Sequence, residues 1–133
     1  MIRIANERNR FTRFNGIMLT ELGDDYAVLE HEITPDSLNL LGVVHGGLIA
    51  TMMDFACGAA ARSDGQTHVT ASMEIKYISN VSSGKLIARS EMISRGRKLS
   101  NVRVKVTDYD SGKLIAEGMA TYYCVGHADP VVE

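Results

Sequence analysis

One aspartate interrupts the most apolar stretch of this 133-residue chain. Residues 42–63 read GVVHGGLIATMMDFACGAAARS, a helical sequence with apolar or small residues on every side and Asp54 in its middle. An unpaired ionised carboxylate in an apolar interior is costly, so Asp54 must face solvent, pair with a basic group, or act as a base or nucleophile. The residues three and four positions away are all small and leave room for a substrate or another subunit: Ala50, Thr51, Cys57 and Gly58.

A second candidate group stands at the amino end of the same helix, in His45-Gly46-Gly47. The first backbone N–H groups of a helix have no partner inside it, and the helix dipole is positive there. Glycine lets a substrate carbonyl approach the Gly46 N–H without a side chain in the way. This arrangement suits an oxyanion hole for acyl transfer, although the spacing alone does not establish one. The alternative is that the glycines only allow close packing of the helix on a sheet.

Two polar residues are expected to support this site. Asn39 precedes the helix, where it either orients an attacking water molecule or the loop, or serves only as a turn residue. We expect His45 to form a local hydrogen bond that fixes the loop, rather than to transfer a proton.

The spacing of Gly46 and Asp54 argues against a site built by one copy of the helix. Asp54 lies eight residues beyond Gly46, about 12 Å along a helix. A carbonyl bonded to Gly46 cannot bring its carbon within the ~3–3.5 Å attack distance of Asp54 on the same helix. A second copy whose helix runs antiparallel would place the Gly46 of one chain beside the Asp54 of the other. The spacing therefore predicts a twofold homodimer with two composite sites.

The rest of the chain reads as strands within one domain of residues 1–133, with residues 1–20 forming a short helix or an arm. Alternating apolar and polar residues bounded by turn formers predict strands at 26–34, 68–78, 85–94, 99–109 and 113–124. In 68–78 the alternation is strict, so Thr70 and Ser72 are expected on the same face. A helix that is apolar on all sides must be buried. We therefore expect an α+β fold in which a curved antiparallel sheet wraps around one long helix.

Composition excludes several classes of function. The net charge of −2 gives no basic field for nucleic acid, and no run approaches the ~20 apolar residues that a membrane span needs. The first residues lack the apolar core of a secretory signal; their arginines suggest a transit peptide, but Glu7 and the short length favour a packed helix. Cys57 and Cys124 are interpreted as reduced thiols of a cytoplasmic protein. The four histidines are scattered, so we expect no metal, and no cofactor is implied.

Asn39, His45-Gly46-Gly47 and Asp54 form the pattern N-x5-H-G-G-x6-D. Together with VTASMEIKY (69–77), SRGRKL (94–99) and SGKLIAEG (111–118), this pattern resembles the PaaI-type hotdog thioesterases over roughly residues 25–123. The resemblance implies a hotdog fold, hydrolysis of an acyl-CoA whose coenzyme A is part of the substrate, and dimers paired into a homotetramer. The alternative is a non-catalytic hotdog module that senses acyl-CoA, although such regulators typically carry a DNA-binding segment.

The resemblance also implies a hydroxyl that positions the nucleophile. This hydroxyl aligns with Thr70 when the strand is anchored on Tyr77, whereas counting from Asp54 selects Ser72. We prefer Thr70. Ser72 then remains a polar residue on a strand face.

Substrate binding is expected to involve three further sets of residues. The basic connector RGRK is predicted to meet the phosphates of coenzyme A, unless it is only a solvated turn; its members are Arg95, Gly96, Arg97 and Lys98. The resemblance places the pantetheine channel along Tyr77 to Ser82. Met52, Met53 and Phe55 suggest an apolar pocket for an aryl ring or a medium-length chain.

Overall fold

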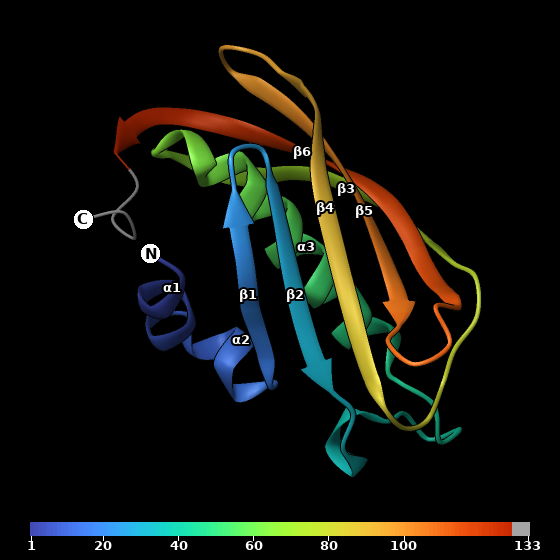
Figure 1. Cartoon of the computed structure of the whole chain (residues 1–133). Coiled ribbons are helices and arrows are strands. Elements are labelled where there is room, and N and C mark those ends of the chain that lie inside the picture. The colour runs from blue at the N-terminus through green and yellow to red at the C-terminus, as the bar shows by residue number, and fades with distance from the viewer. Residues whose placement is uncertain (129–133) are drawn as a thin grey trace.

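The computed structural model describes residues 1–128 and shows a curved sheet around one long helix (Figure 1). The elements are α1 (Ile2–Arg8), α2 (Arg10–Phe14), β1 (Ile17–Gly23), β2 (Tyr26–Glu32), η1 (Pro35–Ser37), α3 (Gly46–Ala61), η2 (Arg62–Asp64), β3 (Gln66–Tyr77), β4 (Lys85–Arg95), β5 (Leu99–Asp108) and β6 (Leu114–Ala128). The six strands lie in the order β1-β2-β4-β5-β6-β3, and all neighbours are antiparallel. This is the hotdog arrangement predicted from the sequence.

The helix α3 lies within the curve of the sheet because its sequence has no broad polar face to present to water. Ten of its sixteen residues are buried. Met52 and Met53 are fully buried in the core, so the prediction that they line an acyl pocket is wrong. Thr51 and Asp54 are half-buried, on the side of the helix that the sheet leaves open.

The edge strand β3 changes the phase of its side chains part-way along. Its pairing with β6 slips by one residue between Thr70 and Ser72, so Ala71 is an extra residue in the ladder. Thr70 faces α3 before this bulge, and Met73 packs against the core after it. The predicted strict alternation is therefore wrong, and Thr70 and Ser72 do not share a face.

The amino-terminal residues form two short helices packed beside β1 (Figure 1). Asn6 attaches them to the sheet, because its side chain donates to the Leu19 carbonyl and accepts the Leu19 N–H at 2.9 and 2.8 Å. β1 begins at Ile17, inside the range expected to form a helix or an arm. The sequence pattern missed this strand because a bulge between Leu19 and Glu21 breaks its alternation.

Candidate active site

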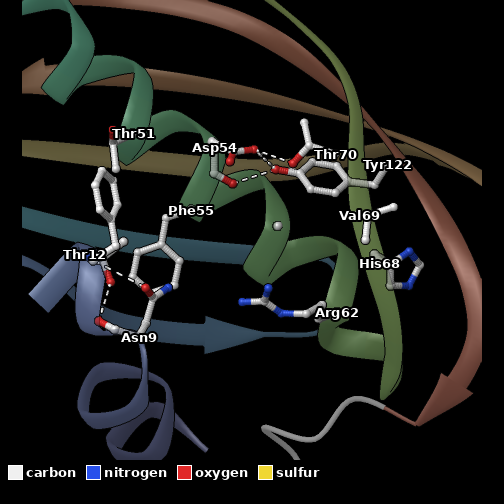
Figure 2. Close-up of a pocket in the computed structure, with 12 residues that line it drawn as sticks. Asn9, Thr12, Thr51, Asp54, Phe55, Arg62, His68, Val69, Thr70 and Tyr122 are labelled. Carbon is white, nitrogen blue, oxygen red and sulfur yellow. Dashed lines mark hydrogen bonds between the residues drawn. The ribbon is translucent and has the colours of Figure 1, made fainter.

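The carboxylate of Asp54 is partnered on one oxygen only. Its Oδ1 accepts hydrogen bonds from Thr70 Oγ1 at 2.8 Å and from Tyr122 Oη at 2.5 Å (Figure 2). No hydrogen bond among residues 1–128 reaches Oδ2. Asp54 is therefore neither an isolated buried charge nor one member of an ion pair. Two neutral hydroxyl groups hold it at the open side of α3.

Tyr122 is a functional candidate that the sequence reasoning missed. It is 3% exposed and stands opposite Thr70 in the β3–β6 ladder. Burial, and then the negative charge of Asp54, raise the pKa of its phenol well above the usual value, so the group stays protonated and donates. The available signal was the alternation of β6, which puts Tyr122 on the buried face with Ala120, where a phenol needs a partner.

Of the two hydroxyl residues that the sequence left open, Thr70 is the one that contacts Asp54. Ser72 follows the bulge, is exposed and makes no hydrogen bond to Asp54. The bulge at Ala71 thus separates the two alternatives in space.

Asp54 opens into a hollow of about 430 Å³ between α3, β3 and the amino-terminal helices, within the range of sites for small molecules. Its lining residues are Asn9, Phe11, Thr12, Thr51, Asp54, Phe55, Gly58, Arg62, His68, Val69, Thr70 and Tyr122. Figure 2 shows Phe55 and α2 on one side and the β3 residues on the other. Of the three apolar residues predicted for the acyl pocket, only Phe55 lines this hollow.

The start of α3 leaves one backbone donor without a partner. His45 caps the helix, and its Nδ1 accepts the Gly47 N–H at 2.9 Å, which is the local hydrogen bond expected of it. The Leu48 N–H donates to the His45 carbonyl at 3.0 Å. Among the first three N–H groups, that of Gly46 alone makes no hydrogen bond within residues 1–128. This free, half-buried donor is what an oxyanion hole requires.

Asn39 shapes the loop that leads into α3. Its Oδ1 accepts the N–H groups of Leu41 and Val43 at 2.9 and 3.3 Å, and its own N–H donates to the Val43 carbonyl at 2.8 Å. These contacts stay within residues 39–43, as is typical of a turn residue that shapes its own loop.

One chain does not bring Gly46 and Asp54 together. The hollow that contains Asp54 does not include Gly46. Both residues belong to the same continuous helix, so they remain about 12 Å apart along its axis. Each chain therefore carries both parts of the predicted chemistry at separate places.

Arg95 does not have the contacts of a phosphate-binding residue. Its Nε and Nη2 donate to Asp25 Oδ1 at 3.1 and 2.7 Å, and its Nη1 donates to Asp64 Oδ2 at 2.8 Å. Its two remaining donors reach the carbonyl oxygens of Ala60 and Ala61 at 3.1 and 3.0 Å. A guanidinium has five N–H groups, and all five are used. We correct the prediction: Arg95 ties the end of β4 to the carboxyl end of α3.

The other members of the basic connector have different surroundings. The Gly96 N–H donates to the Leu99 carbonyl at 2.8 Å, and a Cβ on Gly96 would lie 2.6 Å from that oxygen. The turn itself thus requires glycine. Arg97 and Lys98 are exposed, and the Lys98 ammonium lies 5.9 Å from the centre of the Tyr123 ring. These two side chains carry the charge that the connector can offer to an anion.

Tyr77 and Ser82 lie at the other end of α3 from the connector. The Tyr77 hydroxyl donates to the Gly46 carbonyl at 2.9 Å. Ser82 is exposed in the loop after β3, which is attached to the start of α3 through the Val44 N–H and the Val81 carbonyl at 3.0 Å. In one chain, the two predicted coenzyme A sets are therefore separated by the 16 residues of α3, about 24 Å.

Within residues 1–128, no group of three or more His, Cys, Asp or Glu side chains could hold a metal ion. None of the described helices is long and apolar enough to cross a membrane. Cys57 and Cys124 are free. Burial, and then the charge of Asp54, raise the pKa of the Cys57 thiol to about 12, so it is not a nucleophile at neutral pH.

Several known proteins are similar to this chain over most of its length. Residues 41–115 match the family described as Thioesterase superfamily. Protein Rv1847 of Mycobacterium tuberculosis is 31% identical over 109 residues, which cover 77% of this chain and 77% of that protein. Acyl-coenzyme A thioesterase 13 of Homo sapiens is 28% identical over 125 residues, 91% of this chain and 89% of the relative. The solved structure of the phenylacetic acid degradation protein PaaI from Thermus thermophilus has a TM-score of 0.80 and 27% identity, covering 85% of this chain and 96% of that one.

Proposed function

The chain belongs to the thioesterase superfamily, and we propose that it hydrolyses an aryl- or medium-chain acyl-CoA to the free acid and coenzyme A. The likeness to PaaI-type thioesterases predicted from the sequence is confirmed, and the chain is a thioester hydrolase. The observation that carries the choice of residues is the Asp54 carboxylate, which lines a hollow, is held through Oδ1 by Thr70 and Tyr122, and has no hydrogen bond to Oδ2 within residues 1–128.

In the proposed reaction, the Gly46 N–H and Asp54 act on the same thioester. The thioester oxygen accepts the Gly46 N–H, which is free to donate, and this hydrogen bond strengthens as negative charge develops on the oxygen. Asp54 activates a water molecule as general base or attacks the carbonyl carbon itself. With a general base, the water oxygen bonds to the carbonyl carbon as the C–S bond breaks. With direct attack, the C–S bond breaks as Asp54 forms a mixed anhydride, which water then hydrolyses to release the acid and restore Asp54. In both cases the thiolate of coenzyme A leaves and takes up a proton, and one water molecule is consumed. Coenzyme A enters as part of the substrate, and the reaction needs no separate cofactor.

The edge strand β3 supports a dimer that would bring these two groups together. β3 is 12 residues long, and its outer edge has no partner strand within residues 1–128. Such an edge is a template for pairing with another chain. Antiparallel pairing of two β3 strands about a twofold axis makes the two α3 helices antiparallel as well. The Gly46 of one protomer can then lie beside the Asp54 of the other, and dimers of this kind could pair into a tetramer.

The same dimer would unite the residues proposed to bind coenzyme A. Arg95 fixes the basic connector at the carboxyl end of α3, whereas Tyr77 contacts the amino end. In an antiparallel pair of helices, these opposite ends become neighbours. Arg97 and Lys98 of one protomer would meet the phosphates, while Tyr77 and Ser82 of the other would line the pantetheine channel.

Subunit mixing tests the composite site. One variant, Asp54→Asn, loses the carboxylate charge, and the other, Gly46→Pro, loses the backbone donor. Proline suits this position because Gly46 is the first residue of α3 and His45 before it has φ −62° and ψ 131°, as residues before proline prefer. Gly46→Ala keeps the N–H, and its Cβ would lie 3.5 Å from the Tyr77 ring, an ordinary contact. This variant therefore separates loss of the donor from obstruction of the substrate carbonyl by a side chain.

Each homodimer of the two variants should be nearly inactive towards phenylacetyl-CoA and octanoyl-CoA, followed by thiol release. Random mixing gives about half heterodimers, each with one intact site of two, so about a quarter of wild-type activity should return. Verified, folded heterodimers that stay inactive would show that Gly46 and Asp54 do not meet. Tight acyl-CoA binding without turnover by the wild-type protein would instead support the non-catalytic sensor.

A further inference from the structure

The two hydrogen bonds to Asp54 make its carboxylate oxygens unequal. Both donors, Thr70 Oγ1 and Tyr122 Oη, contact Oδ1. Each hydrogen bond draws negative charge towards Oδ1 and uses its lone pairs, while Oδ2 keeps its own. Both donors come from the sheet, Thr70 from β3 and Tyr122 from β6, and they face Asp54 on α3 (Figure 2).

We infer that Oδ2 of Asp54 is the oxygen that acts on the thioester or on water, and that Tyr122 is the positioning residue that, with Thr70, commits Oδ1 to holding the carboxylate in place. This inference rests on the proposed function. It adds Tyr122 to the proposed site and names the carboxylate oxygen that reacts. It also says what prevents the carboxylate from rotating so that Oδ1 and Oδ2 change places.

Tyr122 is suited to this role by its surroundings. It is almost fully buried, and its Oη also lies 2.6 Å from the backbone carbonyl of Asp54. A phenol has a single proton, and the charged carboxylate at 2.5 Å is the stronger acceptor. Because the phenol resists ionisation, the donor is present throughout the pH range of an assay.

The two donors also form one unit of the sheet. Thr70 and Tyr122 are direct partners in the β3–β6 ladder, immediately before the bulge at Ala71. Their hydroxyl groups therefore keep a fixed spacing and reach the same oxygen from adjacent strands. Rotation of the Asp54 side chain would break both hydrogen bonds at once, which is why Oδ1 and Oδ2 do not exchange freely.

Tyr122→Phe tests this role because it removes only the hydroxyl. With phenylacetyl-CoA and octanoyl-CoA as probes, we expect kcat to fall about tenfold or more while KM changes by less than about twofold. A carboxylate that loses a hydrogen-bond donor takes up a proton more readily, so the acid limb of kcat/KM should move to higher pH. Tyr109→Phe, which removes an exposed phenol hydroxyl elsewhere, is the control and should leave all three quantities unchanged.

Substitution at Thr70 supplies an independent arm if Tyr122→Phe fails to fold, since Thr70 is exposed. Thr70→Val should lower kcat and move the acid limb in the same direction, and Thr70→Ser should restore most of both. Thermal unfolding of each variant separates these effects from loss of the fold. Wild-type kcat and pH profiles in folded Tyr122→Phe and Thr70→Val, or a change in KM alone, would overturn the inference.

Asp54→Asn assayed in parallel distinguishes failure of the role of Tyr122 from failure of the catalytic role of Asp54. If Asp54→Asn is inactive while Tyr122→Phe and Thr70→Val behave like the wild type, only the assignment of Oδ2 and Tyr122 fails. If Asp54→Asn keeps its turnover, the catalytic part of the proposed function fails with it.

Discussion

Asp54 within α3 and Arg95 at the carboxyl end of α3 are charged side chains with very different hydrogen-bond partners. Arg95 meets the carboxyl end of the helix, where the helix dipole is negative, and all five of its N–H groups have acceptors. Asp54 lies in the middle of the helix beside a hollow, with one oxygen doubly hydrogen-bonded and the other without a hydrogen bond within residues 1–128. A charge whose partners are complete holds elements together. A charge with a vacant oxygen beside a cavity is available for chemistry.

The largest effect is expected from Asp54→Asn, which should separate activity from stability. The amide keeps the shape of the side chain but removes the negative charge, so kcat should fall at least about a hundredfold. Stability should be kept or improved, because functional carboxylates are commonly held at some cost to the fold. Steady-state kinetics and thermal unfolding measure the two quantities. Near-normal turnover in a folded variant would show that Asp54, like Arg95, has a structural role only.

Arg95→Leu should give the reverse result. It removes all five donors and leaves Asp25 and Asp64 without their cation, which we expect to lower the free energy of unfolding by about 1–3 kcal/mol. The kcat of the folded fraction should stay close to the wild-type value. Denaturant unfolding is the measurement, and Arg97→Leu, in the same connector but exposed, is the matched control for stability. Equal stability of the two variants would show that the hydrogen bonds of Arg95 do not stabilise the fold.

Charge reversal of the exposed part of the connector should have a smaller effect, confined to binding. In Arg97→Glu combined with Lys98→Glu, we expect KM for acyl-CoA to rise by about tenfold with little change in kcat. Added salt should raise the wild-type KM in the same direction, because exposed charges are screened. A double variant that handles acyl-CoA like the wild type would show that the phosphates lie elsewhere.

The smallest effect is expected when pH changes the thermal stability of the fold. The group concerned is Asp64, one of the carboxylates that accept a hydrogen bond from Arg95. Burial acts to raise the pKa of Asp64, but hydrogen bonds from the Gln66 N–H and His68, with the charges of His68 and Arg95, outweigh it and lower the pKa. A lowered pKa means that this carboxylate stabilises the fold above its ordinary value near 4, and that the contribution is lost as pH falls through the lower, folded value. The melting temperature should therefore fall less steeply below about pH 4 in Asp64→Asn than in the wild type. Parallel curves for the two proteins would contradict this assignment.

The architecture could be predicted from the sequence because its determinants are local. The all-round apolar helix and the alternating strands each carry their burial pattern within a few residues. The local hydrogen bond of His45 could be predicted for the same reason. The partners of Arg95 and Asp54 could not be predicted, because they are distant in sequence. Asp25 lies 70 residues from Arg95, and Tyr122 lies 68 residues from Asp54.

The choice between Thr70 and Ser72 shows a different limit of prediction from the sequence. Both residues fit the alternation of the strand, and counting from either end of the motif gives a different answer. The register slip that separates them depends on how β3 pairs with β6, which the pattern of one strand does not contain.

The extra residue in β3 also divides the strand into two stretches that can vary independently. Residues up to Thr70 set the distance to the carboxylate, whereas residues from Ser72 onward serve the core and the start of α3 through Tyr77. A shorter or longer connection between α3 and β3 can be absorbed by sliding the bulge, without moving either set of side chains to the wrong face. A protein engineer who wishes to relocate the hydroxyl should therefore shift the bulge, and leave the composition of the strand as it is.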